Sequence, residues 1–352
     1  MLYVICYMLY DFYQHLPSFI DPVAFTIGSF SVRWYSISYI IGFLVVYLVL
    51  MWRIRLREVN NIYQISNFQF PISNKILNPK SENKNTNESA RLKVNGQMLN
   101  VVIDFLMVVF FAGLLGGRLG YVLFYNPSFY FANPLSIISP YDLQGHYIGL
   151  FGMSYHGALL GAILAGYVFT YIKKIDFLSW ADFIIVALPA GYFFGRVGNF
   201  LNGELYGRVT NSPLGMYFSV DLANLRHPSQ LYEAFLEGIL LFVVLWLLRN
   251  KKNKKGTLFG IYLMCYGFFR IIAEQFREPD SQLGLFWNFL TMGQLLSLGM
   301  IVFGLFFWFQ KKESNGILNI SFLANCLPAG RQVGDSNSLS FWILAPSNCS
   351  QQ

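Results

Sequence analysis

Charged residues are scarce in this sequence. Asp, Glu, Lys and Arg make up 12% of its 352 residues, whereas apolar residues make up 55%. A soluble globular chain carries about twice that share of charge. The apolar residues also come in long runs between short polar loops, which is typical of helices that cross a lipid bilayer. The composition therefore excludes an ordinary soluble domain.

Cysteine is also rare, and a leader sequence is not evident. The four cysteines have neither the spacing of a metal site nor that of a redox pair. Residues 1–20 lack a basic start and a small-residue cleavage site, so we do not interpret them as a signal peptide. No His, Asp and Glu residues show metal-ligand spacing either. We therefore expect neither a metal nor a cofactor.

The apolar runs predict an all-α membrane protein with seven transmembrane helices. Each run is about the length needed to cross roughly 30 Å of hydrocarbon. The runs cover 36–53, 101–125, 148–172, 180–201, 230–248, 257–276 and 289–310. They define one membrane domain over residues 1–312. A polar insertion at 59–98 interrupts it and a polar tail at 313–352 follows it, and we expect the insertion to be mobile and the tail disordered.

Lysine and arginine collect after the first, third, fifth and seventh runs. Such residues are enriched on the cytoplasmic side of a membrane protein. The loop at 126–147, between the second and third runs, contains neither. We therefore expect the amino terminus outside, the carboxyl terminus in the cytoplasm, and a small outward-facing loop region. The net charge of +7 is largely this orientation signal, so nucleic acid is not an expected partner.

Several arginines break this charge pattern, because they fall in or beside the outward halves of predicted helices. An arginine inside a span costs about 2.5–3.5 kcal/mol on insertion scales, so such residues usually line a cavity and serve a ligand. The alternative is an intramembrane salt bridge that only ties two helices together. The arginines are Arg196, Arg208, Arg226, Arg270 and Arg277.

The sixth run ends in YGFFRIIAEQFREPD, where Arg270, Glu274 and Arg277 share one helical face. Two guanidinium groups with one carboxylate leave a surplus positive charge. A planar, permanently charged guanidinium suits bidentate binding of a phosphate. Tyr266 lies one turn before Arg270 and points to the same face. This face predicts a phosphate-binding surface, with Glu274 holding one arginine in place.

The fourth run ends in GRVGNFLNGELYGR at 195–208, which concentrates polar residues beside an apolar span. Arg196 and Asn199 share a helical face, and Glu204 and Gly207 follow in what should be a tight outer turn. Glycines spaced three to four residues apart in this run allow a neighbouring helix or a lipid chain to approach. Packing alone does not explain this combination of polar side chains.

The third and fifth runs both begin with motifs that contain histidine. MSYHG places His156 near the outer surface, where an imidazole can move a proton near neutral pH, although a structural histidine is the alternative. The fifth run opens with RHPSQLYE, in which Pro228 suits a first helical turn and Glu233 favours a helix start. Structure alone can explain that second motif.

Residues of these types fit more than one class of membrane protein. A transporter or flippase for an anionic solute or lipid also uses intramembrane arginines and glycine-broken helices. Its sites, however, lie near the bilayer midplane, whereas the polar residues here concentrate at the outer ends of the runs. Another enzyme of lipid phosphates and a lipid-binding scaffold are further alternatives.

The motifs resemble those of a known family. GRVGNFLNGELYGR at 195–208 is similar to the signature of the prolipoprotein diacylglyceryl transferases. DPVAFTIGSFSVRWY, GGRLGYVLFYN, MSYHG, RHPSQLYE and YGFFRIIAEQFREPD also resemble segments of that family, in its order. The resemblance extends from Asp21 to about Lys312, apart from the insertion at 59–98.

The resemblance implies a multi-pass enzyme of the bacterial inner membrane with its active site facing the outer side. Such an enzyme moves the diacylglyceryl group of phosphatidylglycerol to the lipobox cysteine thiol of a prolipoprotein signal peptide. The product is a thioether, the leaving group is glycerol phosphate, and the step begins lipoprotein maturation. The expected partners are therefore phosphatidylglycerol, prolipoproteins and the bilayer.

The resemblance also implies roles for individual residues. Arg196 and Arg270 would stabilise the charge on the departing phosphate, and His156 would take the thiol proton. Ala158 stands where the family usually has a second glycine after its histidine, which narrows helix packing but removes no reactive atom. The expected catalytic residues are His156, Arg196, Arg270 and Tyr266. The expected lipid-binding residues are Tyr35, Arg196, Asn199, Glu204, Gly207, Glu274 and Arg277.

Overall fold

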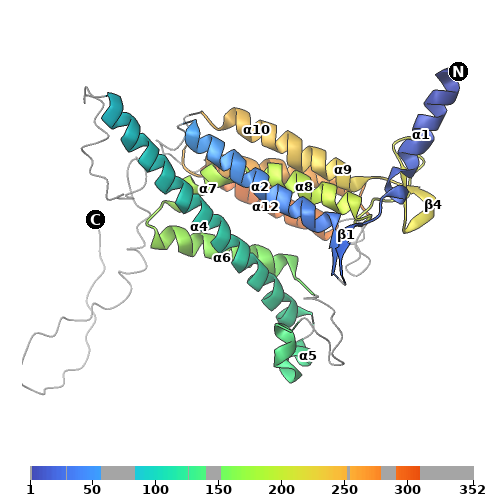
Figure 1. The fold of residues 1–352 in the computed structure, drawn as a ribbon, viewed down its shortest axis with the longest axis horizontal. Coiled ribbons are helices and arrows are strands. Elements are labelled where there is room, and N and C mark those ends of the chain that lie inside the picture. Colours follow the sequence, from blue (N-terminus) through green and yellow to red (C-terminus); the bar gives the residue numbers. More distant parts are fainter. Residues whose placement is uncertain are drawn as a thin grey trace, which may run out of the picture. The chain divides into compact units, whose positions relative to one another are not determined.

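A computed structural model describes residues 2–28, 30–56, 84–125, 127–139, 152–251, 254–278 and 291–309, and these are mostly helical (Figure 1). The long helices are α2 (Trp34–Arg55), α4 (Lys84–Phe124), α6 (Tyr155–Ile172), α11 (Thr257–Glu274) and α12 (Met292–Phe309). One broken helix accompanies them, namely α7 (Phe177–Ile185) with α8 (Leu188–Leu201). A further, continuous helix consists of α9 (Ser229–Glu233), the π-helix η2 (Ala234–Leu240) and α10 (Leu241–Leu248).

Within these ranges, six helices are long and apolar enough to cross a membrane, or seven if α7 and α8 form one span bent by 49°. The bend has a local cause, because Pro189 in the first turn of α8 has no N–H to donate to the preceding turn. Only 17–33% of the apolar window of each of the six spans is buried, so their outer faces present apolar side chains to lipid. The chain is a mostly helical, multi-pass membrane protein, as predicted.

One predicted boundary differs from the structure. Helix α4 begins at Lys84, so residues 84–98 of the expected mobile insertion are helical and continuous with the second span. Outside the hydrocarbon a helix does not need to be apolar, so polar residues with high helix propensity can extend a span there. Residues 59–83 and the tail at 313–352 lie outside the described residues.

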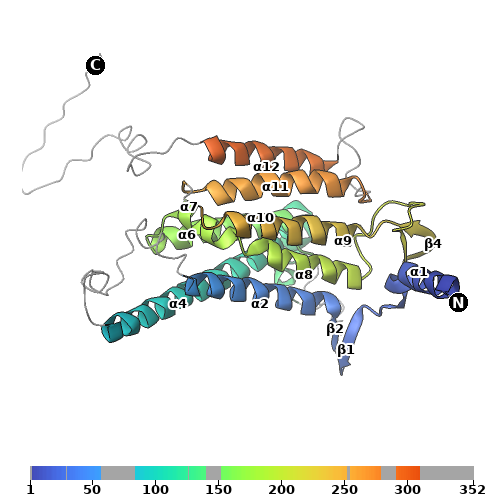
Figure 2. The ribbon, with the colours of Figure 1, turned by 90° about the horizontal axis from the view of Figure 1, so that it is seen from above.

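Close glycine contacts hold antiparallel helix pairs together (Figure 2). A Cβ atom on Gly42 of α2 would lie 2.8 Å from the carbonyl oxygen of Gly191 in α8. A Cβ on Gly116 of α4 would lie 2.4 Å from the carbonyl oxygen of Gly157 in α6. Glycine permits backbones to approach this closely. The glycines of the fourth run therefore serve a neighbouring helix, namely α2.

The two ends of the helix bundle differ in character. We call the end where α2, α6 and α10 stop the basic end, since Arg53, Lys173 and Arg249 lie there. Lys255, at the start of α11, pairs there with Asp176 at the start of α7 at 3.4 Å. The opposite end, where α2 begins and α8 and α11 stop, carries the signature residues and is called the site end. The charge asymmetry seen in the sequence is therefore an asymmetry of the folded bundle.

The expected outward loop region contains more structure than the sequence indicated. Two antiparallel hairpins lie at the site end, β1 (Val23–Ile27) with β2 (Phe30–Arg33), and β3 (Met216–Phe218) with β4 (Asp221–Arg226). A further helix, α1 (Leu2–Phe19), packs against β3. Short helices α5 (Pro127–Ala132) and η1 (Pro134–Ile137) follow α4. A small core of Phe200, Met216 and Phe218 joins the second hairpin to the end of α8.

Candidate active site

Arg196 is the centre of a polar network on α8. Its Nε atom donates to the Tyr192 hydroxyl at 2.7 Å and lies 2.8 Å from Oε2 of Glu233. Its Nη1 atom donates to Oδ1 of Asn199 at 3.3 Å, and Asn199 in turn donates to Glu204 at 2.8 Å. The structure therefore brings Arg196, Asn199 and Glu204 together, as the spacing of the motif predicted.

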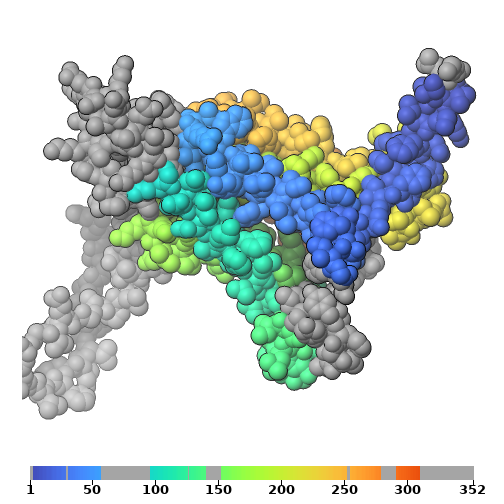
Figure 3. Space-filling model, viewed as in Figure 1, coloured from blue at the N-terminus to red at the C-terminus, as the bar shows by residue number. Residues whose placement is uncertain are grey.

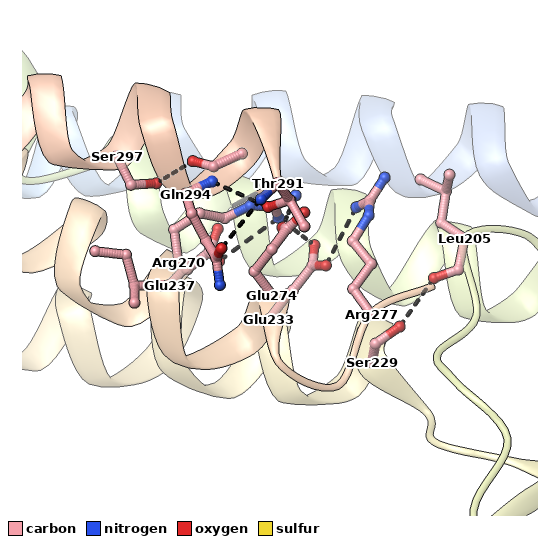
Figure 4. Close-up of polar contacts among 12 residues, drawn as sticks. Leu205, Ser229, Glu233, Glu237, Arg270, Glu274, Arg277, Thr291, Gln294 and Ser297 are labelled. Atoms are coloured by element: carbon pink, nitrogen blue, oxygen red, sulfur yellow. Dashed lines mark hydrogen bonds and ion pairs between the residues drawn. The ribbon is translucent and has the colours of Figure 1, made fainter. Parts of the chain in front are cut away.

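Arg270, on α11, and Arg277, three residues beyond the end of α11, approach the same carboxylate (Figure 4). Because α11 ends at Glu274, Arg277 does not continue the helical face that the sequence predicted. Arg270 lies 3.0 Å from Glu233 through Nη1 and 3.0 Å from Glu274 through Nη2. Arg277 Nη1 donates to Oε1 of Glu233 at 3.2 Å. Glu274 thus holds Arg270, as the shared helical face predicted, while Arg277 is held by a different helix.

Glu233 and Glu237 belong to this cluster, although the sequence analysis did not place them in the site. Their side chains are 1% and 0% exposed, and both carboxylates reach Arg270, at 3.0 Å and 3.7 Å. Glu237 also accepts a short hydrogen bond from the Tyr192 hydroxyl. A carboxylate inside a span is about as costly as an arginine there. The two glutamates in the apolar segment LYEAFLEGILLF could therefore have been recognised as candidates for the site. Glu233 is the contact point of the cluster, rather than only a helix-start residue.

These carboxylates remove the surplus positive charge that the sequence predicted. Arg196, Arg270 and Arg277 are balanced by Glu233, Glu237 and Glu274. Buried charges require this balance, because an unpaired charge in a low-dielectric interior costs several kcal/mol. An anion that enters the cluster must therefore replace a carboxylate as partner of an arginine, unless a carboxylate takes up a proton.

Some polar atoms of the cluster keep unused hydrogen-bonding capacity. Within the described residues, Arg270 Nη1, Glu237 Oε1 and Glu274 Oε2 are buried and lie in ion pairs of 3.0–3.7 Å, but none of these contacts has the geometry of a hydrogen bond. Buried polar atoms are normally satisfied, and each exception calls for an explanation. A ligand that brings acceptor oxygens to Arg270 would supply the missing partner.

The two tyrosines expected at the site lie beside this cluster. The Tyr266 ring packs edge-on against Tyr192 with centroids 5.9 Å apart. Tyr35, in the first turn of α2, donates to the Tyr39 hydroxyl at 3.2 Å and lies within electrostatic range of Arg196 and Glu204. Both residues therefore border the arginines, as the family resemblance implied.

Backbone packing explains why residue 207 is a glycine, without reference to a ligand. Its N–H donates to the His227 carbonyl at 2.8 Å, and it forms an isolated bridge with Arg277. A Cβ atom there would lie 2.3 Å from the Phe276 carbonyl oxygen. Only glycine permits this backbone approach, which positions Arg277 beside the cluster.

Arg208 and Arg226 face away from the cluster and serve the loops. Arg208 Nε donates to the Arg277 carbonyl at 2.9 Å. Arg226 pairs with Asp221 at 2.7 Å and with Glu278 at 3.1 Å. The hydrogen bond from Arg226 lowers the pKa of the Asp221 carboxyl. The alternative interpretation, in which an arginine only ties parts of the protein together, therefore describes these two residues better than ligand binding does.

His156 lies on α6, a helix that carries none of the three arginines of the cluster. It lies in the first turn of α6, is exposed, and its ring packs edge-on against that of Tyr155. Tyr155 is within electrostatic range of Tyr262, whose ring stacks on Tyr266 at 5.7 Å. Aromatic side chains therefore lie beside both His156 and the cluster.

Ala158 is accommodated by the helix opposite. A Cβ atom on Gly117 of α4 would lie 3.3 Å from the Ala158 methyl group. Glycine at position 117 leaves space for that methyl group.

The described residues contain no group of three or more His, Cys, Asp or Glu side chains that could hold a metal ion.

Comparison with known proteins is consistent with this site. Residues 22–73 and 83–310 match the family described as prolipoprotein diacylglyceryl transferase. A phosphatidylglycerol–prolipoprotein diacylglyceryl transferase from Chlorobaculum tepidum is 40% identical over 86% of this chain and 94% of its own length. Proteins of the same name from Desulfotalea psychrophila and Rickettsia bellii are 41% and 40% identical, over 87% and 82% of this chain and 99% and 94% of their own lengths.

Proposed function

The chain belongs to the prolipoprotein diacylglyceryl transferase family, and we propose how its cluster of arginines and carboxylates transfers the diacylglyceryl group of phosphatidylglycerol to a prolipoprotein. The observation that carries the proposal is the convergence of Arg196, Arg270 and Arg277 on Glu233. The family does not favour the transporter or flippase that the composition also allowed. The chain is a multi-pass membrane enzyme.

The phosphate of phosphatidylglycerol binds between Arg196 and Arg270. Both side chains are mostly buried, with 16% and 14% exposed, so water competes weakly for them. On binding, the phosphate replaces Glu233 as the partner of at least one guanidinium and accepts hydrogen bonds from it. Asn199, Glu204 and Tyr35 line the approach from α8 and α2, while Glu274 and Arg277 hold the α11 side.

The reaction exchanges one bond at the glyceryl carbon. The lipobox cysteine loses its proton, its thiolate attacks the carbon that carries the phosphate, and a carbon–sulfur bond forms as the carbon–oxygen bond breaks. Glycerol phosphate leaves with the electron pair. Arg196 and Arg270 stabilise the negative charge that develops on the leaving phosphate. Tyr266 fixes the position of Tyr192, which holds Arg196.

His156 accepts the thiol proton, directly or through a water. Its exposed position at the site end suits a group that meets an incoming peptide rather than the buried lipid phosphate.

The site end faces outward from the bacterial inner membrane. The basic end gathers the residues that the positive-inside rule assigns to the cytoplasm, which puts the amino terminus outside and the carboxyl terminus inside. A secreted prolipoprotein therefore meets the enzyme at the side where its cysteine emerges.

A single assay tests this proposal. Purified enzyme is incubated with phosphatidylglycerol radiolabelled in an acyl chain and with a lipobox peptide, and label on the peptide cysteine is measured. We expect Arg270→Gln to lower turnover by about 10²–10³-fold, as loss of an oxyanion donor does. Lys255→Gln, which alters an ion pair at the basic end, is the matched control and should retain full turnover. Undiminished transfer by Arg270→Gln would remove it from the phosphate site.

The role of His156 needs its own comparison. His156→Gln should retain binding of phosphatidylglycerol but lose turnover, with partial recovery at high pH where the thiol ionises unaided. Turnover equal to the unsubstituted enzyme at neutral pH would exclude His156 as the base.

A further inference from the structure

Helix α1 lies outside the part of the chain that matches the family, which begins at residue 22. Its second half is fixed to the site end. The Tyr13 hydroxyl donates to the Leu214 carbonyl at 3.1 Å, and the His15 ring stacks on Tyr217 at 4.6 Å. Tyr13 and Ile20 also pack on the core that contains Phe218. This half of α1 is therefore part of the folded body.

The first half of α1 is apolar but uncovered. Residues 3–10 are all exposed, and none of them is charged. Figure 3 shows this half projecting from the body without neighbours on the visible face. Burying a large apolar side chain gains about 1.5–3 kcal/mol, so a row of them in water is unfavourable. Those with the largest exposed fractions are Tyr3 at 83%, Met8 at 66%, Tyr7 at 65% and Leu9 at 63%.

Exposed apolar residues also occur along the chain between α1 and the first span. Phe19, at the end of α1, is 69% exposed, and Ile27 in the first hairpin is 67% exposed. Trp34, the first residue of α2, is 40% exposed. These residues lie between the end of α1 and the start of α2, which is long and apolar enough to cross the bilayer. The chain therefore leads from α1 through one hairpin directly into a membrane span.

The size, direction and composition of α1 fit the membrane interface. Residues 3–12 form a helix of about 15 Å, half of the roughly 30 Å needed to span. Figures 1 and 2 show α1 beside β4 and turned away from the direction of α2. Tyrosines at 3, 7 and 10 are of the type that gathers where hydrocarbon meets headgroups.

We propose that the first half of α1 lies in the bilayer interface at the site end and holds the second hairpin against the lipid surface. Its ligand is the lipid surface itself, bound by apolar burial without a specific headgroup. The inference goes beyond the transfer reaction, since it concerns residues that touch neither the cluster nor His156.

Cys6 provides a direct test in the full-length enzyme, because it is exposed on this half of α1. With Cys265, Cys326 and Cys349 replaced by alanine, Cys6 is labelled with bimane and the protein is placed in phosphatidylglycerol–phosphatidylcholine liposomes. Quenching by a lipid-borne nitroxide is compared with quenching by aqueous iodide. Two control labels replace Cys6, one at Phe303→Cys on the exposed face of α12 and one at Asn211→Cys in an exposed polar loop.

We expect the Cys6 label to behave like the Phe303→Cys label, quenched by the lipid nitroxide and protected from iodide by about fivefold relative to Asn211→Cys, because hydrocarbon excludes ions. Iodide quenching equal to that of Asn211→Cys would overturn the proposal. Protection from both quenchers, or protection that appears only when a lipobox peptide is added, would assign α1 to a protein partner and overturn it as well.

Discussion

Glu233 lies 2.8 Å from Nε of Arg196, and this pair joins the start of the fifth span to the end of the fourth. Because Glu233 is 1% exposed, the pair is shielded from water and salt. The same carboxylate also meets Arg270 and Arg277. Structure and reaction therefore depend on one side chain.

Glu233→Gln should destabilise the protein and abolish most activity. The substitution leaves buried guanidinium groups without their shared counter-charge, and breaking a buried pair costs about 3–5 kcal/mol. Thermal unfolding in detergent measures the loss. Glu278→Gln is the control, because that side chain is 49% exposed in its pair with Arg226 and should cost less than about 1 kcal/mol. Equal melting temperatures for the two variants would contradict the central role of Glu233.

Tyr192→Phe should lower turnover while the fold is retained. Its hydroxyl connects Arg196 Nε to Glu237, and a hydrogen bond to a charged group contributes about 1.5–3 kcal/mol, or roughly 10–100-fold. Steady-state kinetics with phosphatidylglycerol measure the effect. Tyr262→Phe is the control, because the Tyr262 ring stacks on Tyr266 and phenylalanine retains that stacking. A similar change in both variants would show that the hydroxyl of Tyr192 does not position Arg196.

Gly207→Ala should displace Arg277 from the cluster. The added methyl group would meet the Phe276 carbonyl oxygen at 2.3 Å and His227 Cβ at 2.7 Å, and overpacking of this kind costs about 1–3 kcal/mol. We expect a lower melting temperature together with reduced turnover. Gly299→Ala, where a Cβ would meet nothing within 4 Å, should change neither. Full turnover in Gly207→Ala would show that the backbone at this bridge can move without cost.

Protonation of His227 should make the protein less stable as the pH falls. Burial lowers the pKa of its imidazole below the usual 6.5, so the unfolded chain takes up a proton more readily than the folded one. The contribution is complete above pH 6.5 and is lost as the pH falls through the lowered pKa. Melting temperatures between pH 7.5 and 5 measure it. His227→Phe retains the packing on Phe276 and should flatten that part of the profile. An unchanged slope would assign the pH dependence to other groups.

Much of the fold followed from local sequence. The spans were recognised because a transmembrane helix must present apolar side chains along its whole length, and a loop next to it needs polar ones. Arg196, Asn199 and Glu204 were grouped correctly because they are neighbours along the chain. Arg270 and Glu274 were paired correctly because residues four apart share a helical face.

The tertiary structure decided how charge is distributed in the site. Glu233 and Glu237 stand on a different helix from each of the arginines that they meet, and no local pattern says which helix faces will pack together. His156 was expected near the outer surface, and it is exposed in the first turn of α6, at the site end.

The sequence by itself determined that this is a membrane protein of its family, with arginines inside its spans, because hydrophobic run length and short motifs are local properties. Only the tertiary structure decided that those arginines are neutralised by carboxylates from another helix. The physical reason is that buried charges must be paired, and the partner is chosen by helix packing rather than by position in the chain.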